Sequence, residues 1–334
     1  GPVFDEVIPR NGYVWWYVDA VSDDGEHGLT IIAFVGSVFS PYYAFARRRA
    51  GDAGADPMNH CSLNIALYGK RNSRWAMTER GCGSVERNET SLSIGPSAMY
   101  WQDQKLVIDF DEICVPWPRR IRGQIVLHPE ALNQESHVLD RAGLHRWRPI
   151  SPCARVSVNI RSPQLAWHGP AYFDSNAGDA PLENSFRSWQ WSRVKLPSAA
   201  DHKPDIAGDT AVLYDILRLD GSTRFLTRKY APHAARQESS QHVDMPANAS
   251  SIALPPSAWG LPRTTRGTGQ GAADTTQIQI ATLEDGPFYA RSSVSMPHGS
   301  QTAQAIHESL SLDRFRSPLV QAMLPFRMPR RIGP

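Results

Sequence analysis

The sequence lacks the signatures of several large classes of protein. Its net charge is only +2 over 334 residues, and no regularly spaced basic stripe appears, which argues against a nucleic-acid partner. No apolar run is long enough to span a bilayer, and the longest, residues 29–39, is typical of a buried strand. None of the four cysteines forms a C-x-x-C pair, so we expect reduced thiols, no zinc site and a cytoplasmic protein. The cysteines are Cys61, Cys82, Cys114 and Cys153.

Motifs for cofactors are also missing. The sequence contains no G-x-S-x-G, G-x-x-x-x-G-K-[ST] or H-E-x-x-H motif, and its eleven histidines are scattered. Residues 267–272 fit the dinucleotide pattern G-x-G-x-x-A, but the polar residues 263–266 precede them where a hydrophobic strand is required. We therefore expect no metal, nucleotide or flavin cofactor.

The pattern of hydrophobic residues predicts an all-β protein. Short β-branched or alternating runs are separated by clusters of Gly, Pro, Asn and Asp, which is typical of antiparallel sheets and barrels. A strong hairpin signal, Asp220-Gly221, joins two of these runs, and no long amphipathic helix is evident before the C-terminus. The predicted strands are 29–35, 63–68, 106–110, 121–127 and 155–160, then 189–194, 212–219, 223–230, 277–283 and 288–294.

Two aromatic motifs divide the chain into similar halves. Trp15-Trp16-Tyr17 opens the first strand-rich half and Trp189-Gln190-Trp191 opens the second. This repetition indicates two related barrels, residues 1–165 and 166–334, joined by a connecting segment at 162–188.

The connecting segment carries the most informative residues. Tyr172-Phe173-Asp174 places one carboxyl group among aromatic rings, and the turn formers of residues 175–179 follow it. An apolar setting disfavours a charged carboxylate, so Asp174 can hold a proton to donate. Aromatic faces stabilise a cation, and chemistry through a carbocation is therefore one interpretation. The alternative is a turn closed by Asp174, with Tyr172 and Phe173 in the core.

Two other groups of polar residues are weaker candidates. Asp109, Asp111 and Glu112 could share acid–base chemistry, but alternation with Ile108 and Phe110 favours an exposed face of a strand. The motif around His145 and Trp147 lies between an Ala-Gly turn and a proline, where a lone histidine is usually a packed residue.

Several long segments resemble the acyclic carotenoid 1,2-hydratase (hydroxyneurosporene synthase) family of purple bacteria. These segments are rich in Trp and Tyr and occur between about residues 11 and 331, nearly the whole chain. They lie at residues 12–20, 36–43, 172–178, 189–193 and 307–315. The family is similar in turn to lipocalin-like proteins, so the resemblance implies two consecutive lipocalin-like (calycin) antiparallel β-barrel domains.

The resemblance also implies an activity and its residues. Enzymes of the family add water to the terminal 1,2 double bond of acyclic carotenoids such as neurosporene and lycopene, and the product carries a tertiary 1-hydroxy group. They are hydro-lyases that need no cofactor. Its H-x-W and Y-x-D pairs match His145 and Trp147, and Tyr172 and Asp174. By this match Asp174 protonates C-2, while Trp147 and Tyr172 stabilise the cation at C-1. His145 either binds the water or restores the proton on Asp174.

Two other functions remain open at this stage. A lipocalin-like carrier would bind a carotenoid or lipid without chemistry and would not depend on Asp174. A cofactor-free terpenoid cyclase would use the same kind of cation but would form a ring instead of an alcohol. The preferred carotenoid and the oligomeric state are not indicated by the sequence.

A membrane-dissolved substrate raises the question of how the protein reaches it. Residues 39–49 combine four aromatics with three consecutive arginines, and residues 318–331 also run from apolar to basic. Such residues favour the bilayer interface and anionic lipid heads, which predicts peripheral docking on the inner or photosynthetic membrane. The alternative is that Tyr42, Tyr43 and Phe45 end a core strand beside a solvated basic loop. Gly1-Pro2 has the form of a tag-cleavage scar, and the sequence does not indicate whether the native N-terminus is present.

Overall fold

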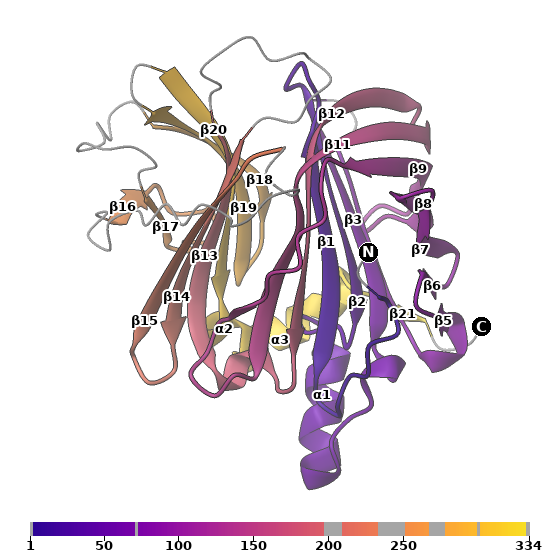
Figure 1. The fold of residues 1–334 in the computed structure, drawn as a ribbon. Coiled ribbons are helices and arrows are strands. Elements are labelled where there is room, and N and C mark those ends of the chain that lie inside the picture. Colours follow the sequence, from indigo (N-terminus) through magenta and orange to yellow (C-terminus); the bar gives the residue numbers. More distant parts are fainter. Residues whose placement is uncertain are drawn as a thin grey trace. The chain divides into compact units, whose positions relative to one another are not determined.

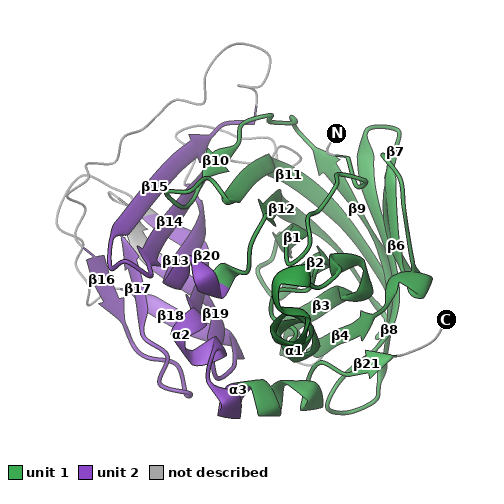
Figure 2. Ribbon diagram, turned by 90° about the horizontal axis from the view of Figure 1, so that it is seen from below, with its two compact units in different colours: residues 1–182, 321–334 green, residues 183–320 purple. Residues whose placement is uncertain are grey.

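The computed structural model describes residues 3–70, 73–196, 209–232, 251–266, 278–298 and 301–331. The chain forms two compact units, one of residues 1–182 with 321–334 and one of residues 183–320 (Figure 2). The predicted boundary at residue 165 therefore differs from the division between the units. It falls at the start of β12 (Leu165–Gly178), which pairs with the strand before it as a hairpin.

The first unit is built on a 13-stranded sheet (Figure 1). Its order is β21-β4-β3-β2-β1-β12-β11-β9-β8-β7-β6-β5, with β10 paired to β11. All pairs are antiparallel except that of β21 with β4. The strands are β1 (Tyr13–Val21), β2 (His27–Val35), β3 (Cys61–Gly69), β4 (Arg74–Arg80), β5 (Val85–Arg87), β6 (Ser91–Ile94), β7 (Ser97–Gln102), β8 (Lys105–Ile113), β9 (Arg120–Pro129), β10 (His137–Val138), β11 (His145–Ser162), β12 and β21 (Arg330–Arg331).

This sheet curls around a hydrophobic core. Strands β4 and β8 are far apart in the sheet order, yet Arg80 of β4 donates a buried hydrogen bond of 2.7 Å to Glu112 of β8. One face of each central strand supplies the core, as with Val14, Trp16 and Val18 of β1. Period-2 alternation sends the intervening residues to the opposite face. The all-β prediction is confirmed by these curled antiparallel sheets.

All five strands predicted in the first half are present. Strands β2, β3, β8 and β9 contain the predicted runs, and residues 155–160 form the second part of β11. The turn predicted at residues 175–179 is wrong, because residues 175–178 complete β12. Strand β12 pairs with β1 on one side and β11 on the other, and this pairing outweighs the local turn preference of Ser, Asn and Gly.

One helix was not evident from the sequence. Helix α1 (Pro41–Ala50) begins at the N-cap Ser40, whose hydroxyl accepts hydrogen bonds from the N–H groups of Tyr42 and Tyr43. The remaining helices are short: α2 (Leu312–Phe315), α3 (Pro318–Met323) and the 3₁₀ turns η1 (Gly51–Ala53), η2 (Pro57–Asn59), η3 (Cys82–Ser84), η4 (Leu182–Asn184) and η7 (Leu324–Phe326). Within the described residues, no helix is long and apolar enough to cross a membrane.

The second unit contains a six-stranded antiparallel sheet in the order β15-β14-β13-β20-β19-β18 and a two-stranded sheet of β16 and β17. The Asp220-Gly221 hairpin is confirmed between β14 and β15, where Gly221 adopts a φ of 80°. The strand predicted at 277–283 corresponds to β18, which begins at Gln279 within the described residues. Residue 277 and the segment 267–272 lie outside the described residues. The strands are β13 (Phe186–Lys195), β14 (Thr210–Arg218), β15 (Thr223–Tyr230), β16 (Ser251–Leu254), β17 (Arg263–Arg266), β18 (Gln279–Asp285), β19 (Tyr289–His298) and β20 (Gln301–Ser311).

Candidate active site

A group of buried polar and aromatic residues lies on three adjacent strands of the first unit, on the face opposite its core. We call this group the carboxylate face. Strand β12 lies in the middle, with β1 and β11 on its two sides. All members are at most 6% exposed. They are Tyr13, Trp15, Tyr17 and Asp19 of β1, His145 and Trp147 of β11, and Tyr172, Asp174 and Asn176 of β12.

Asp174 accepts two short hydrogen bonds on one carboxyl oxygen. The indole Nε1 of Trp147 and the hydroxyl of Tyr172 each donate to Oδ2 at 2.8 Å. Trp147 of β11 stands opposite Asn176, which lies two residues from Asp174 on the same face of β12. The long side chain of Trp147 therefore reaches the Asp174 carboxyl group along that face. Tyr172 precedes Asp174 by two residues and shares its face for the same reason. The turn interpretation of Asp174 is therefore incorrect.

The strand ladder is interrupted directly beside Asp174. Two residues of β11, Pro149 and Ile150, stand opposite this single residue of β12, which is a β-bulge. The flanking pairs are Arg148 with Ser175 and Ser151 with Phe173. Proline has no N–H to donate, so Pro149 favours a break in the ladder at this point. Bulges are common next to active sites, because they bend the strand and change the direction of its side chains.

Strand β1 contributes a second carboxyl group to the same face. Tyr17 stands opposite Asp174 in the register, and Asp19 stands opposite Tyr172. The Tyr17 hydroxyl donates to Asp19 Oδ2 at 3.1 Å, and its ring meets that of Tyr172 edge to face with centroids 6.2 Å apart. Asp19 is completely buried.

His145 lies on the carboxylate face but at a distance from Asp174. It stands opposite Gly178, four residues along β12, which corresponds to about 13 Å of strand. Its Nδ1 forms a hydrogen bond of 2.9 Å with the Tyr13 hydroxyl, and the two rings stack. A Cβ atom on Gly178 would come within 2.4 Å of the Tyr13 ring and 2.7 Å of Nδ1, so only glycine allows this contact.

Burial determines the charge of His145. It lowers the pKa of His145 to about 4, although the nearby carboxylates of Asp140 and Asp179 act in the opposite direction. The imidazole is therefore neutral near pH 7. Because its ring is neutral and hydrogen-bonded to Tyr13, His145 is better placed to orient a hydroxyl group or a water molecule than to supply protons.

The structure thus brings together three of the four residues predicted from the sequence: Trp147, Tyr172 and Asp174. Two further members, Tyr17 and Asp19, were missed as site residues although they lie in a segment that carried the family resemblance. Their signal was a second Y-x-D motif, Tyr17-Val18-Asp19, which matches Tyr172-Phe173-Asp174 in spacing.

The acidic cluster of β8 lies elsewhere and is structural. Ile108 and Phe110 enter the core, as predicted, while Asp109 and Asp111 are partly exposed on the other face. Asp111 pairs with Arg120 at 2.6 Å. Glu112 is buried, and burial raises the pKa of its carboxyl group against the opposing effect of the nearby Arg80.

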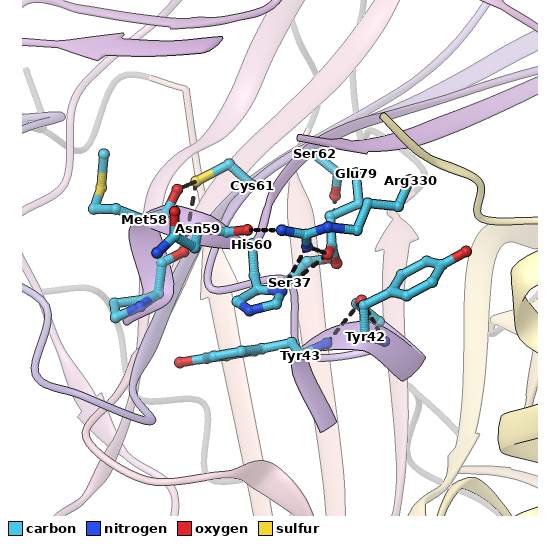
Figure 3. Close-up of polar contacts among 12 residues, drawn as sticks. Ser37, Tyr42, Tyr43, Met58, Asn59, His60, Cys61, Ser62, Glu79 and Arg330 are labelled. Carbon is cyan, nitrogen blue, oxygen red and sulfur yellow. Dashed lines mark hydrogen bonds and ion pairs between the residues drawn. The ribbon is translucent and has the colours of Figure 1, made fainter. Parts of the chain in front are cut away.

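A second buried polar cluster holds the C-terminal segment on the first unit (Figure 3). Glu79 contacts His60 Nδ1 at 2.9 Å and also forms an ion pair with Arg330 of β21. Arg330 donates a second hydrogen bond, of 3.0 Å, to the carbonyl of Asn59. Tyr43 stacks on His60 with centroids 4.7 Å apart. These contacts provide His60 with a hydrogen-bond partner and an aromatic neighbour.

Within the described parts of the chain, no three His, Cys, Asp or Glu side chains are placed to hold a metal ion.

Comparison with known proteins places the chain among enzymes of carotenoid metabolism. The profile of the carotenoid hydratase CrtC family matches residues 31–334. The acyclic carotenoid 1,2-hydratase of Thiocapsa roseopersicina is 48% identical over 330 residues, covering 99% of this chain and 76% of that protein. The corresponding protein of Cereibacter sphaeroides is 36% identical over 310 residues, covering 91% of this chain and 99% of that protein.

Among solved structures, a crystal structure of CghA with Sch210972 is similar with a TM-score of 0.48 at 9% identity, covering 93% of this chain and 94% of that one. The sequence relatives are far closer than this structural neighbour. With a family profile that covers most of the chain and relatives that match it almost from end to end, the chain belongs to the carotenoid hydratase family.

Proposed function

We propose that this protein adds water to the terminal 1,2 double bond of an acyclic carotenoid by acid catalysis at Asp174. The observation that supports this mechanism best is the buried carboxyl group of Asp174, with two donors on a single oxygen. An unactivated alkene is a poor base, so its protonation requires a strong acid in a site without bulk water.

The surroundings of Asp174 meet both requirements. Burial disfavours the charged form of a carboxyl group, and in this mechanism Asp174 carries the proton before the alkene reacts. When the proton leaves, the donors Trp147 Nε1 and Tyr172 Oη stabilise the carboxylate that remains. Stabilising the conjugate base makes the acid stronger without adding a charge to the resting site.

Protonation at C-2 moves the π electrons into the new C–H bond and leaves a tertiary cation at C-1. The rings of Trp147, Tyr172 and Tyr17 surround the carboxyl group, and their faces stabilise such a cation electrostatically. Water then captures C-1 and gives the tertiary alcohol. His145 and Tyr13 lie further along the same face. In this mechanism they orient either a hydroxyl group of the substrate or a water molecule that is moving toward Asp174.

Labelled water tests this function directly. Purified protein incubated with lycopene in detergent micelles and ¹⁸O-labelled water is expected to yield a product that has gained one labelled oxygen and two hydrogens. A cyclic isomer of unchanged mass would instead support a terpenoid cyclase. Tight binding of lycopene with no change in mass would support a carrier.

Helix α1 supports the further proposal that the protein docks on the membrane that holds its substrate. Phe45 is 58% exposed, and Arg48 and Arg49 are exposed beside it. Arg47 differs, because it is buried and stacks over the Tyr43 ring at 4.5 Å. The aromatic residues of this segment therefore do not end a core strand, because they lie in helix α1. Its basic residues do not form a fully solvated loop, because Arg47 is buried. Phe45, Arg48 and Arg49 together have the aromatic and basic character that favours an anionic lipid surface.

We expect the protein to co-sediment with anionic liposomes at low ionic strength and to be released by salt. Each basic residue near such a surface contributes about 1 kcal/mol, so replacing both Arg48 and Arg49 by Ser should weaken binding roughly 30-fold. A variant with Arg122→Ser and Arg141→Ser removes the same charge from other exposed sites and serves as the control. Equal binding of the two double variants would show that α1 is not the docking element.

A further inference from the structure

The carboxylate face contains two copies of one arrangement. In Tyr17-Val18-Asp19 of β1 and in Tyr172-Phe173-Asp174 of β12, the tyrosine hydroxyl donates to Oδ2 of the aspartate two residues later, at 3.1 Å and 2.8 Å. The strands are antiparallel and in register, so each tyrosine stands opposite the other strand's aspartate. The four side chains therefore alternate around one small patch of sheet.

The two carboxyl groups are diagonal neighbours in this patch. Diagonal residues of an antiparallel pair lie about 7–8 Å apart, so both carboxyl groups border the same small patch of the sheet. Carboxyl groups separated by roughly 6.5–9.5 Å can hold a water molecule between them, with one group acting as acid and the other as base.

We propose that Asp19 is the base that takes the proton from the water that adds to C-1. This inference rests on the proposed hydration and completes it. Protonation by Asp174 leaves a carboxylate there and a cation at C-1. The oxygen of water forms the new C–O bond, and one of its O–H bonds breaks, passing its proton to a carboxylate oxygen of Asp19.

Return of that proton to Asp174 resets the site. The Tyr17 hydroxyl is hydrogen-bonded to Asp19 and the Tyr172 hydroxyl to Asp174, so in this proposal these two hydroxyls pass the proton from one carboxyl group to the other. The hydrogen bond from Trp147 distinguishes the two aspartates, because it stabilises the carboxylate left by the initial proton donor. The sum of the steps is alkene plus water giving alcohol, with no other reactant.

An experiment in deuterated water separates the two roles. If Asp19 is the base, Asp19→Asn still forms the cation, but the cation mostly loses a hydrogen from C-2 and returns to alkene. Recovered lycopene should then carry deuterium, and the ratio of deuterium exchange to alcohol formation should rise at least tenfold over that of the unaltered protein. Tyr17→Phe, which keeps the carboxyl group but removes its hydrogen bond, should raise the same ratio by a smaller factor.

Both quantities are measured in one sample, so the ratio does not depend on how much of a variant is folded. Asp174→Asn should lose exchange and hydration together, and this result tests the proposed function separately. An unchanged ratio in both Asp19→Asn and Tyr17→Phe would overturn the role of Asp19 as the base. Loss of exchange together with hydration in Asp19→Asn would overturn it as well, because it would assign Asp19 to the first proton transfer.

Discussion

The Asp174→Asn variant is expected to fold normally and to lose carotenoid hydration, with kcat lowered by about 10²–10⁴-fold. An amide has nearly the same size as a carboxylic acid, but it cannot donate a proton of comparable acidity. The hydrogen bonds from Trp147 and Tyr172 can still reach the amide oxygen, so the packing of the site is retained. Alcohol formation from lycopene, measured beside a thermal melting curve, checks both parts of this expectation.

A matched control is available on the same unit. Asp103 is exposed in the turn between β7 and β8, where it adopts a φ of 48° that asparagine tolerates well. Asp103→Asn makes the same chemical change away from the carboxylate face, and it should leave kcat unaltered. Near-normal turnover in folded Asp174→Asn protein would show that another group supplies the proton.

The Trp147→Leu variant is expected to have the second largest effect, with kcat lowered by about 10²–10³-fold. The substitution removes a hydrogen bond to a charged group, worth about 1.5–3 kcal/mol, from the carboxylate that forms in the transition state. It also removes the ring face that stabilises the cation, a contact worth about 2 kcal/mol when desolvated. Both interactions are stronger with the transition state than with the neutral alkene, so carotenoid affinity should change much less than kcat.

Two further variants separate these contributions. Trp147→Phe keeps an aromatic face but has no N–H donor, so its loss of kcat should fall between that of Trp147→Leu and the unaltered protein. Trp101→Leu removes an indole that packs against Phe173 on the core face, and it should lower the melting temperature with little change in kcat. If Trp147→Leu altered only the affinity, Trp147 would be a wall of the binding site and not a stabiliser of charge.

The local pattern of the sequence determined much of the architecture. Apolar or alternating runs identified β2, β8 and β9 correctly as strands, because the apolar residues of these runs enter the core. The same reasoning placed Ile108 and Phe110 in the core. The family resemblance paired Tyr172 with Asp174, and the structure places both on one face of β12, since residues two apart on a strand share a face.

Pairing between distant segments determined the remainder of the candidate site. The sequence predicts a connecting segment where β12 forms, because Ser, Asn and Gly weaken the local strand signal. Its neighbours β1 and β11 supply hydrogen bonds on both sides, and Tyr17 and Asp19 thereby come to lie beside Asp174 from more than 150 residues away in the chain. Register likewise placed His145 four residues from Asp174 along the strand, while packing against Tyr43 buried Arg47 within a basic run. The sequence by itself determined which residues alternate on several strands, and its family resemblance led to the proposal of Asp174 as the acid with Trp147 and Tyr172 as partners. Only the tertiary structure decided which strands adjoin and in what register, because those depend on side chains that meet after folding and not on the preferences of neighbouring residues.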